Sequence, residues 1–103
     1  TIVLESTSLP LLPGATGLAE EGHLTGGCRR NRAYLQDKVI VEPSVRPGLV
    51  EIGFDPQTSG GLLIAVPHSD ASSLVAELHA SGVTAATIIG KATSYQGTRV
   101  RLI

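Results

Sequence analysis

The chain has 103 residues, of which 42% are hydrophobic and 17% are charged, and its formal net charge is -1. A chain of this length buries one modest core, so we expect residues 1–103 to form a single domain. The balanced charge and the low aromatic content exclude the basic, base-stacking surface of a nucleic-acid-binding protein. One cysteine excludes an internal disulfide, and no apolar run approaches the ~18 residues of a membrane span, so we expect a cytoplasmic protein.

The first half of the chain carries weak secondary-structure signals. Residues 1–6 (TIVLES) alternate like the two faces of a short strand. Residues 8–27 predict a short helix, because Ser8 is a suitable cap and apolar residues recur at helical spacing, although Pro13 and nearby glycines weaken it. Residues 28–48 are expected to be mostly irregular, with a cationic turn, an apolar run at 39–41 and a loop broken by prolines.

The second half carries clearer signals. Residues 61–67 (GLLIAVP) predict a buried strand that ends at Pro67. Residues 69–82 predict an amphipathic helix, capped by Ser69 or Asp70 and closed by Gly82. Residues 83–90 and 98–103 predict two further strands. The apolar stripe of the helix consists of Ala71, Leu74, Val75 and Leu78.

Together these elements predict an α+β fold, with a mixed β-sheet of about four strands and helices packed mainly on one face. The core is expected to come from aliphatic residues of the second half, namely Leu62, Leu63, Ile64, Val66, Leu74, Val75, Leu78, Ile88 and Ile89.

The most unusual stretch is DPQTSGG, which directly precedes the predicted buried strand. Its candidate site residues are Asp55, Thr58, Ser59, Gly60 and Gly61. The paired glycines permit positive φ and close approach, so backbone N–H groups there suit an anion. The hydroxyls can bond phosphate, and the acid can accept N–H groups or hold a cation through water. The alternative, which the chemistry alone favours, is a tight turn whose glycines only relieve packing.

The longer run DPQTSGGLL, residues 55–63, resembles the signature in the carboxyl-terminal domain of selenophosphate synthetase (selenide, water dikinase). TGGCRRNRAY, residues 25–34, is similar to that family's GG-T-x-x-N-x-x-Y segment, with matches at Gly26, Gly27, Asn31 and Tyr34. LPLLPGA, residues 9–15, resembles the family's preceding segment. The chain departs from the family at Cys28, where the family often has Thr, so a hydroxyl-specific role is not carried over to that position.

The resemblance implies the second domain of a two-domain enzyme, in the superfamily of aminoimidazole ribonucleotide synthetase. The complete enzyme would convert ATP, selenide and water to selenophosphate, AMP and phosphate, with Mg²⁺ on the polyphosphate, and would be a homodimer. In that family the catalytic Cys or selenocysteine, its partner Lys and most metal-binding acids belong to an amino-terminal nucleotide-binding domain. That domain is the implied partner of this chain. A start at Thr1 fits either processing or excision from a longer protein.

We therefore assign no catalytic residue and no metal ligand to this chain, and we expect it to be inactive and to bind no cofactor by itself. Secondary site candidates are Gly26, Gly27, Arg29 and Asn31. The cluster of Arg29, Arg30 and Arg32 either meets phosphate or the acidic face of the missing domain, or is simply solvated. Cys28 has no His or Lys at a suggestive spacing, the histidines lack zinc-site spacing, and IIGKATS lacks the glycine spacing of a Walker motif.

These inferences lead to one hypothesis, in which the Asp55–Gly61 loop faces the catalytic cleft of a selenophosphate synthetase and helps to close it over the nucleotide phosphates. The alternative is a non-catalytic interaction module, in which the same loop docks against another domain and its glycines serve packing. An effect of phosphate on the protein would separate the two hypotheses.

Overall fold

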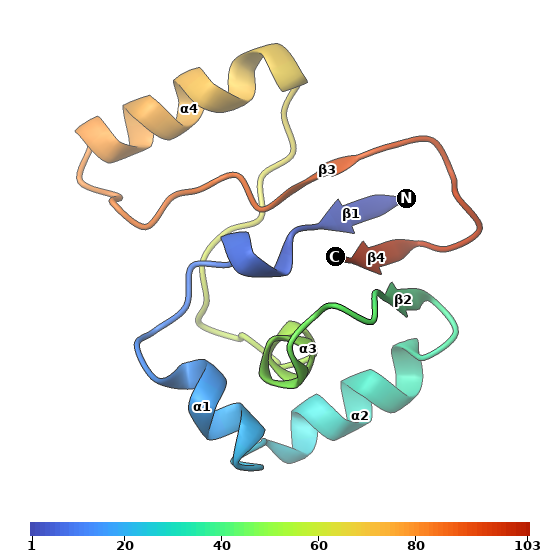
Figure 1. Cartoon of the computed structure of the whole chain (residues 1–103). Coiled ribbons are helices and arrows are strands. Elements are labelled where there is room, and N and C mark those ends of the chain that lie inside the picture. Colours follow the sequence, from blue (N-terminus) through green and yellow to red (C-terminus); the bar gives the residue numbers. More distant parts are fainter. The chain divides into compact units, whose positions relative to one another are not determined.

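The computed structural model describes residues 1–103. The chain divides into two compact units, one formed by Thr1–Pro56 with Ile89–Ile103 and the other by Gln57–Ile88. No helix has both the length and the apolar character needed to cross a membrane. The elements in chain order (Figure 1) are β1 Ile2–Leu4, the 3₁₀ helix η1 Ser6–Ser8, α1 Ala15–Glu20, α2 Gly26–Leu35, β2 Val39–Val41, α3 Pro47–Gly53, α4 His68–Ala80, β3 Gly90–Ala92 and β4 Val100–Leu102.

The sheet of the first unit joins both ends of the chain. Its strand order is β2-β4-β1-β3, in which β1 and β2 are parallel to β4 and β3 is antiparallel to β1. Val3 therefore lies opposite Arg101 on one side and Lys91 on the other. Figure 1 shows the two termini in the neighbouring strands β1 and β4. The predicted α+β class with a four-stranded mixed sheet is confirmed, as are the strands expected within residues 1–6 and 98–103.

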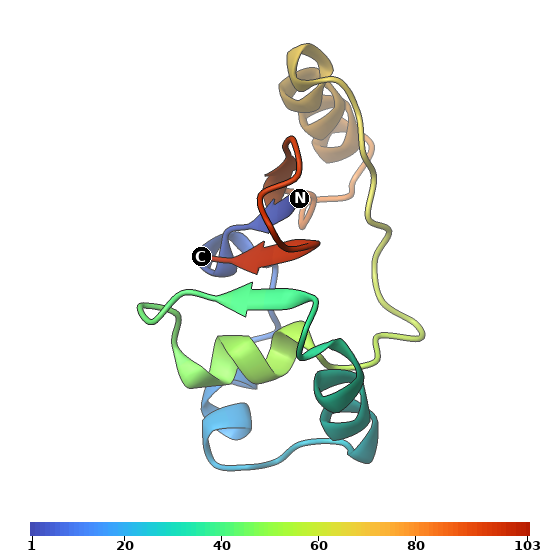
Figure 2. The same cartoon turned by 90° about the vertical axis from the view of Figure 1, so that its right-hand side faces the viewer.

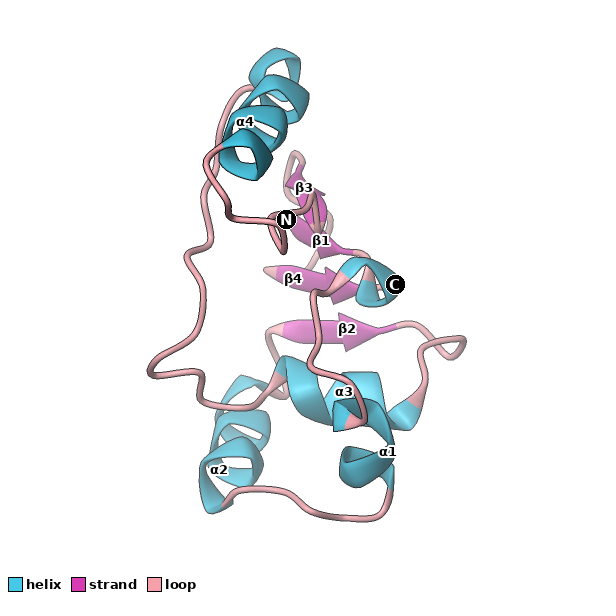
Figure 3. Cartoon of the chain, turned by 90° about the vertical axis from the view of Figure 1, so that its left-hand side faces the viewer, coloured by secondary structure: helices cyan, strands magenta, loops and turns pink.

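The core of the first unit lies where α2, α3 and β4 meet. Leu4, Leu35 and Val39 pack against its rim. Figures 2 and 3 show α1, α2 and α3 together on the β2 side of the sheet. The buried cluster draws its residues from α2, α3, β4 and the chain next to α3. The buried cluster consists of Cys28, Val45, Leu49, Val50, Phe54 and Leu102.

Helix α2 occupies residues 28–35 of the stretch that was expected to be mostly irregular, α3 begins at its end, and that expectation is wrong. Thr25 caps α2, because its side chain accepts a hydrogen bond from the Cys28 backbone N–H at 3.0 Å. Pro47 stands in the first turn of α3, where its missing N–H has no helical partner to lose. Pro47, one of the prolines that suggested a loop, is thus the starting signal of a helix. The run at 39–41 forms β2.

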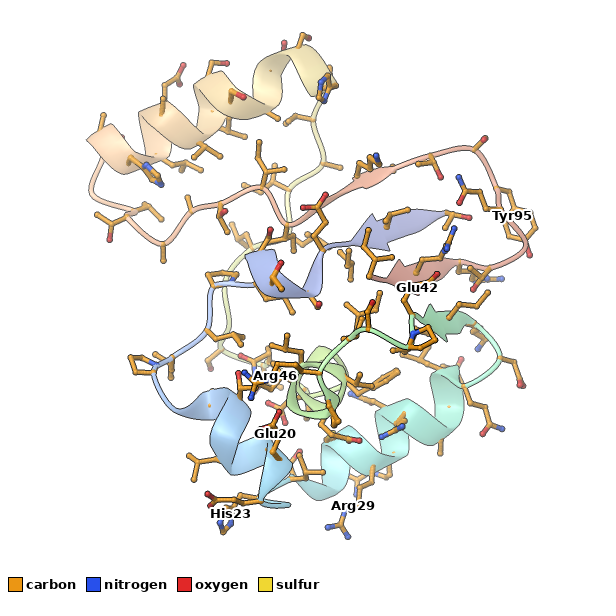
Figure 4. The ribbon with its side chains drawn as sticks, viewed as in Figure 1. Glu20, His23, Arg29, Glu42, Arg46 and Tyr95 are labelled. Carbon is orange, nitrogen blue, oxygen red and sulfur yellow. The ribbon has the colours of Figure 1, made fainter.

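Helix α1 is shorter than the helix predicted for residues 8–27. It begins at Ala15, after Gly14 at a φ of +84°, and Ser8 ends η1 instead of capping a helix. Pro13 and Gly14 therefore stop the helical pattern from extending toward the amino terminus. Arg46, just before α3, donates to both carboxylate oxygens of Glu20 at 2.9–3.2 Å, and Figure 4 shows these two side chains facing each other.

The second unit contains α4, which confirms the helix predicted within residues 69–82. Its stripe of Ala71, Leu74, Val75 and Leu78 is half-buried, while the rest of the helix is exposed. Gly82 closes the helix at a φ of +91°, donating to the His79 carbonyl at 3.0 Å. The predicted capping by Ser69 or Asp70 is wrong, because Pro67 is the residue at the cap.

The predicted strands at 61–67 and 83–90 are absent, and the core expected from them is wrong. Residues 61–70 are all exposed, and Leu62 exposes 90% of its surface and Leu63 73%. A strand needs a neighbouring strand as its hydrogen-bonding partner, and an apolar run does not supply one. All four strands of the sheet, including β3 at Gly90–Ala92, belong to the first unit. The core therefore forms around α3 instead of around residues 62–66.

Two leucine substitutions test which residues form the core. Leu49 is 7% exposed, so Leu49→Ala is expected to lower the free energy of unfolding, by about 2–5 kcal/mol. Leu62→Ala removes the same atoms from an exposed side chain and is expected to change the free energy of unfolding by less than about 0.5 kcal/mol. Urea denaturation of the two variants measures both values. Equal losses, or a larger loss at Leu62, would contradict this assignment of the core.

Candidate functional site

Two of the three segments that carry the family resemblance meet within the first unit, at Thr25 and at Asp55, although they lie far apart in the sequence. The Thr25 hydroxyl donates a hydrogen bond to Oδ1 of Asp55 at 3.0 Å, across 30 residues of chain. The side-chain amide of Asn31 donates to the backbone carbonyl of Phe54 at 3.0 Å. Helix α2 and its cap therefore hold the chain where α3 ends and DPQTSGG begins.

Gly27 allows the closest approach in this region. A Cβ atom built on Gly27 would lie 2.5 Å from Cγ of Pro56, a separation that real atoms do not adopt. A Cβ on Gly26 would meet only the end of the flexible Arg30 side chain, at 3.3 Å. The structure thus gives one of the two predicted glycines a definite packing reason, since any side chain at 27 would push Pro56 away from α2.

The second half of DPQTSGG belongs to the second unit and has a different character. Thr58, Ser59, Gly60 and Gly61 are all exposed. The Gly60 N–H donates to the Gln57 carbonyl at 3.3 Å and closes a tight turn. Neither glycine adopts the positive φ that the sequence permits. A Cβ on Gly61 would meet nothing within 4 Å, so this glycine leaves its backbone open on the surface.

The predicted arginine cluster is divided between paired and unpaired cations. Arg32 forms an ion pair with Glu51, whereas Arg29 and Arg30 have neither a hydrogen bond nor an ion pair. Figure 4 shows the Arg29 side chain pointing away from α2. Arg29 and Arg32 both line an open cavity of about 450 Å³, whose other lining residues are Leu24, Ala33, Gln36 and Glu51.

The sequence analysis missed Thr25 and Glu51. Thr25 precedes a pair of glycines and a helix, so its capping role had a local signal in the sequence. Glu51 had none, because its partners come from another helix. Its carboxylate pairs with Arg32, and its backbone carbonyl accepts from the Cys28 thiol at 3.2 Å. Cys28 is fully buried at 0% exposure and contributes to the core.

No group of three or more His, Cys, Asp or Glu side chains lies close enough together to hold a metal ion. Thr25 already occupies one oxygen of the Asp55 carboxylate. The expectation that the metal ligands belong to another domain stays a prediction.

No family model matches the chain, but curated relatives match most of it. The selenide, water dikinase of Agathobacter rectalis is 42% identical over 88 residues, which are 85% of this chain and 26% of that protein. The one of Caldanaerobacter subterraneus is 40% identical over 93% of this chain and 28% of the relative. The selenide, water dikinase of Nitratidesulfovibrio vulgaris is 45% identical over 75% of this chain and 23% of the relative.

The chain belongs to the selenide, water dikinase family. It corresponds to the carboxyl-terminal region of these dikinases and spans about a quarter of their length. The resemblance drawn from DPQTSGGLL and TGGCRRNRAY is thereby confirmed. The individual site residues within these dikinase segments stay predictions.

Two glycine-to-alanine substitutions test the close approach of α2 to Pro56. Alanine normally stabilises a helix relative to glycine, and Gly17 in α1 has open space around it. Gly17→Ala is therefore expected to raise the free energy of unfolding by about 0.5–1 kcal/mol. Gly27→Ala is expected to lower it by about 1–3 kcal/mol, because the new methyl group overlaps the proline ring. Chemical denaturation of both variants decides the point, and a stabilising Gly27→Ala would show that α2 and Pro56 do not pack closely.

Proposed function

We propose that this chain is the carboxyl-terminal domain of a selenophosphate synthetase, the enzyme that converts ATP, selenide and water to selenophosphate, AMP and phosphate. The observation that carries the proposal is the similarity of 75–93% of the chain to selenide, water dikinases at 40–45% identity. The remaining three quarters of such a protein would include the amino-terminal nucleotide-binding domain. That domain is the proposed partner of this chain.

In the proposed complete enzyme, a cytoplasmic homodimer, ATP and Mg²⁺ are bound mainly by the amino-terminal domain. Phosphoryl transfer needs positioned groups and neutralised charge more than covalent chemistry by the protein. The contribution of this chain is to place hydrogen-bond donors against the polyphosphate and to exclude water from it. We assign no nucleophile and no general base to its residues.

Within DPQTSGG, we assign the phosphate-facing role to the exposed turn of Thr58, Ser59, Gly60 and Gly61. Its hydroxyls and the open backbone at Gly61 are accessible to a ligand. Asp55 carries negative charge, which repels phosphate, and its carboxylate accepts from Thr25. We therefore treat Asp55 as an anchor of the segment. Arg29, an exposed cation with no ion-pair partner, is a secondary phosphate candidate.

The alternative is a non-catalytic docking module, and one observation favours it for part of the segment. The contact of Gly27 with Pro56 is a packing contact that needs no ligand. If the whole of DPQTSGG acts in this way, the exposed turn would contact protein instead of phosphate. The two functions differ in whether a side chain added at the turn affects turnover independently of stability.

The isolated chain is expected to produce no selenophosphate, because the nucleotide-binding domain is supplied by the rest of the enzyme. AMP formation that depends on selenide measures this directly, with the complete enzyme as the positive control. AMP formation by the chain alone, above a reaction without protein, would contradict the assignment of catalysis to two domains.

Gly61→Val in the complete enzyme tests the exposed turn. A Cβ at Gly60 would lie 2.8 Å from Cβ of Gln57, so a substitution there disturbs the turn itself, whereas Gly61 has open space. Gly61→Val is expected to lower turnover by about tenfold or more, with the free energy of unfolding changed by less than about 0.5 kcal/mol. Ser59→Ala removes one neutral hydrogen bond and is expected to lower turnover by about tenfold at most.

Gly17→Val is the matched control for Gly61→Val, because Gly17 also has open space but lies in α1. It is expected to leave turnover unchanged. The measurements are initial rates of AMP formation and the urea midpoint of each variant. A Gly61→Val enzyme that turns over like the Gly17→Val enzyme would favour the docking module.

A further inference from the structure

The Thr25 hydroxyl accepts one hydrogen bond and donates another. It accepts from the Cys28 backbone N–H at 3.0 Å and donates to Oδ1 of Asp55 at 3.0 Å. A hydroxyl has one hydrogen to donate, so the bond to Asp55 uses its full donor capacity. Since Thr25 is also the cap of α2, the Asp55 carboxylate is tied to a fixed point at the start of a ten-residue helix.

Three consecutive residues are held by α2 and its cap. The Phe54 carbonyl accepts a hydrogen bond from Asn31, and the Asp55 carboxylate accepts one from Thr25. Pro56 packs closely against α2, because Gly27 has no side chain. All of these contacts lie within the first unit, which ends on this side at Pro56. Of the three, only the contact of Thr25 holds an ionised side chain.

We propose that Thr25 is a positioning residue for selenophosphate synthesis and acts through Asp55. The proposal rests on the proposed function of DPQTSGG and extends it to a residue outside that segment. The Thr25 hydroxyl touches neither substrate nor nucleotide in this account. Through this bond it holds the Asp55 carboxylate, the anchor of DPQTSGG, at the cap of α2, because hydrogen bonds to a charged acceptor are stronger than neutral ones.

The capping role of Thr25 must be separated from its role toward Asp55. Thr25→Asp keeps a side-chain acceptor for the Cys28 N–H, since Asp is a favoured cap. It removes the donor and places a second carboxylate opposite Asp55, so the hold on Asp55 is lost while α2 keeps its cap. Thr25→Ser keeps both the acceptor and the donor. Asp55→Ala removes the group that is positioned.

The experiment is a double-mutant cycle in the complete enzyme, with kcat for AMP formation and the free energy of unfolding measured for each variant. On the natural background, Thr25→Asp is expected to lower kcat by about 10- to 100-fold and Thr25→Ser by less than about threefold. On the Asp55→Ala background, Thr25→Asp is expected to lower kcat by less than about twofold, because there is no carboxylate left for Thr25 to hold. A free energy of unfolding of Thr25→Asp close to that of the natural enzyme establishes that the cap of α2 is kept.

Three results would overturn the proposal. Equal losses of kcat from Thr25→Asp on both backgrounds would mean that Thr25 acts on the helix and not through Asp55. An Asp55→Ala enzyme with natural kcat would mean that the carboxylate needs no positioning. A Thr25→Ser enzyme as slow as Thr25→Asp would mean that the hydroxyl is not the group responsible. Failure of the proposed function is distinguishable, because the unsubstituted complete enzyme would then make no selenophosphate.

Discussion

The first unit depends on the close packing of α2 against the end of α3, which residue 27 permits because it has no side chain. With the backbone of Gly27 against Pro56, Cys28 is fully buried and its thiol reaches the Glu51 carbonyl. The same approach brings Arg32 to the Glu51 carboxylate and Asn31 to the Phe54 carbonyl. One steric constraint therefore gives α2 its burial, its ion pair and its hold on the segment that follows α3.

This packing divides DPQTSGG into two parts with different physical roles. Asp55 and Pro56 are held against α2 and its cap, as in the structural alternative that the chemistry alone favoured. The turn from Thr58 to Gly61 is exposed and its last glycine has open space. The proposed phosphate contact needs only the exposed part.

The sequence was enough to identify the segments of the candidate site, but not the contacts between them. DPQTSGG and TGGCRRNRAY were identified because each is a contiguous run. That they touch could not be predicted, because Thr25 and Asp55 are 30 residues apart and neither has a periodic pattern pointing to the other. Glu51 was missed for the same reason. Thr25 had a capping signal, but it lay inside the stretch of residues 8–27 that was predicted to be a single helix.

The sequence by itself determined the features that depend on neighbouring residues. The alternation of residues 1–6 and 98–103 predicted strands that are present. The apolar stripe of α4 follows from spacings of three and four residues, and the end of the helix follows from Gly82, which adopts a positive φ. Only the tertiary structure decided which apolar residues are buried. Residues 62–66 have the stronger hydrophobic run, yet Leu49, Phe54 and Leu102 form the core. Burial requires a complementary surface from elsewhere in the chain, and no local pattern encodes which segment supplies it.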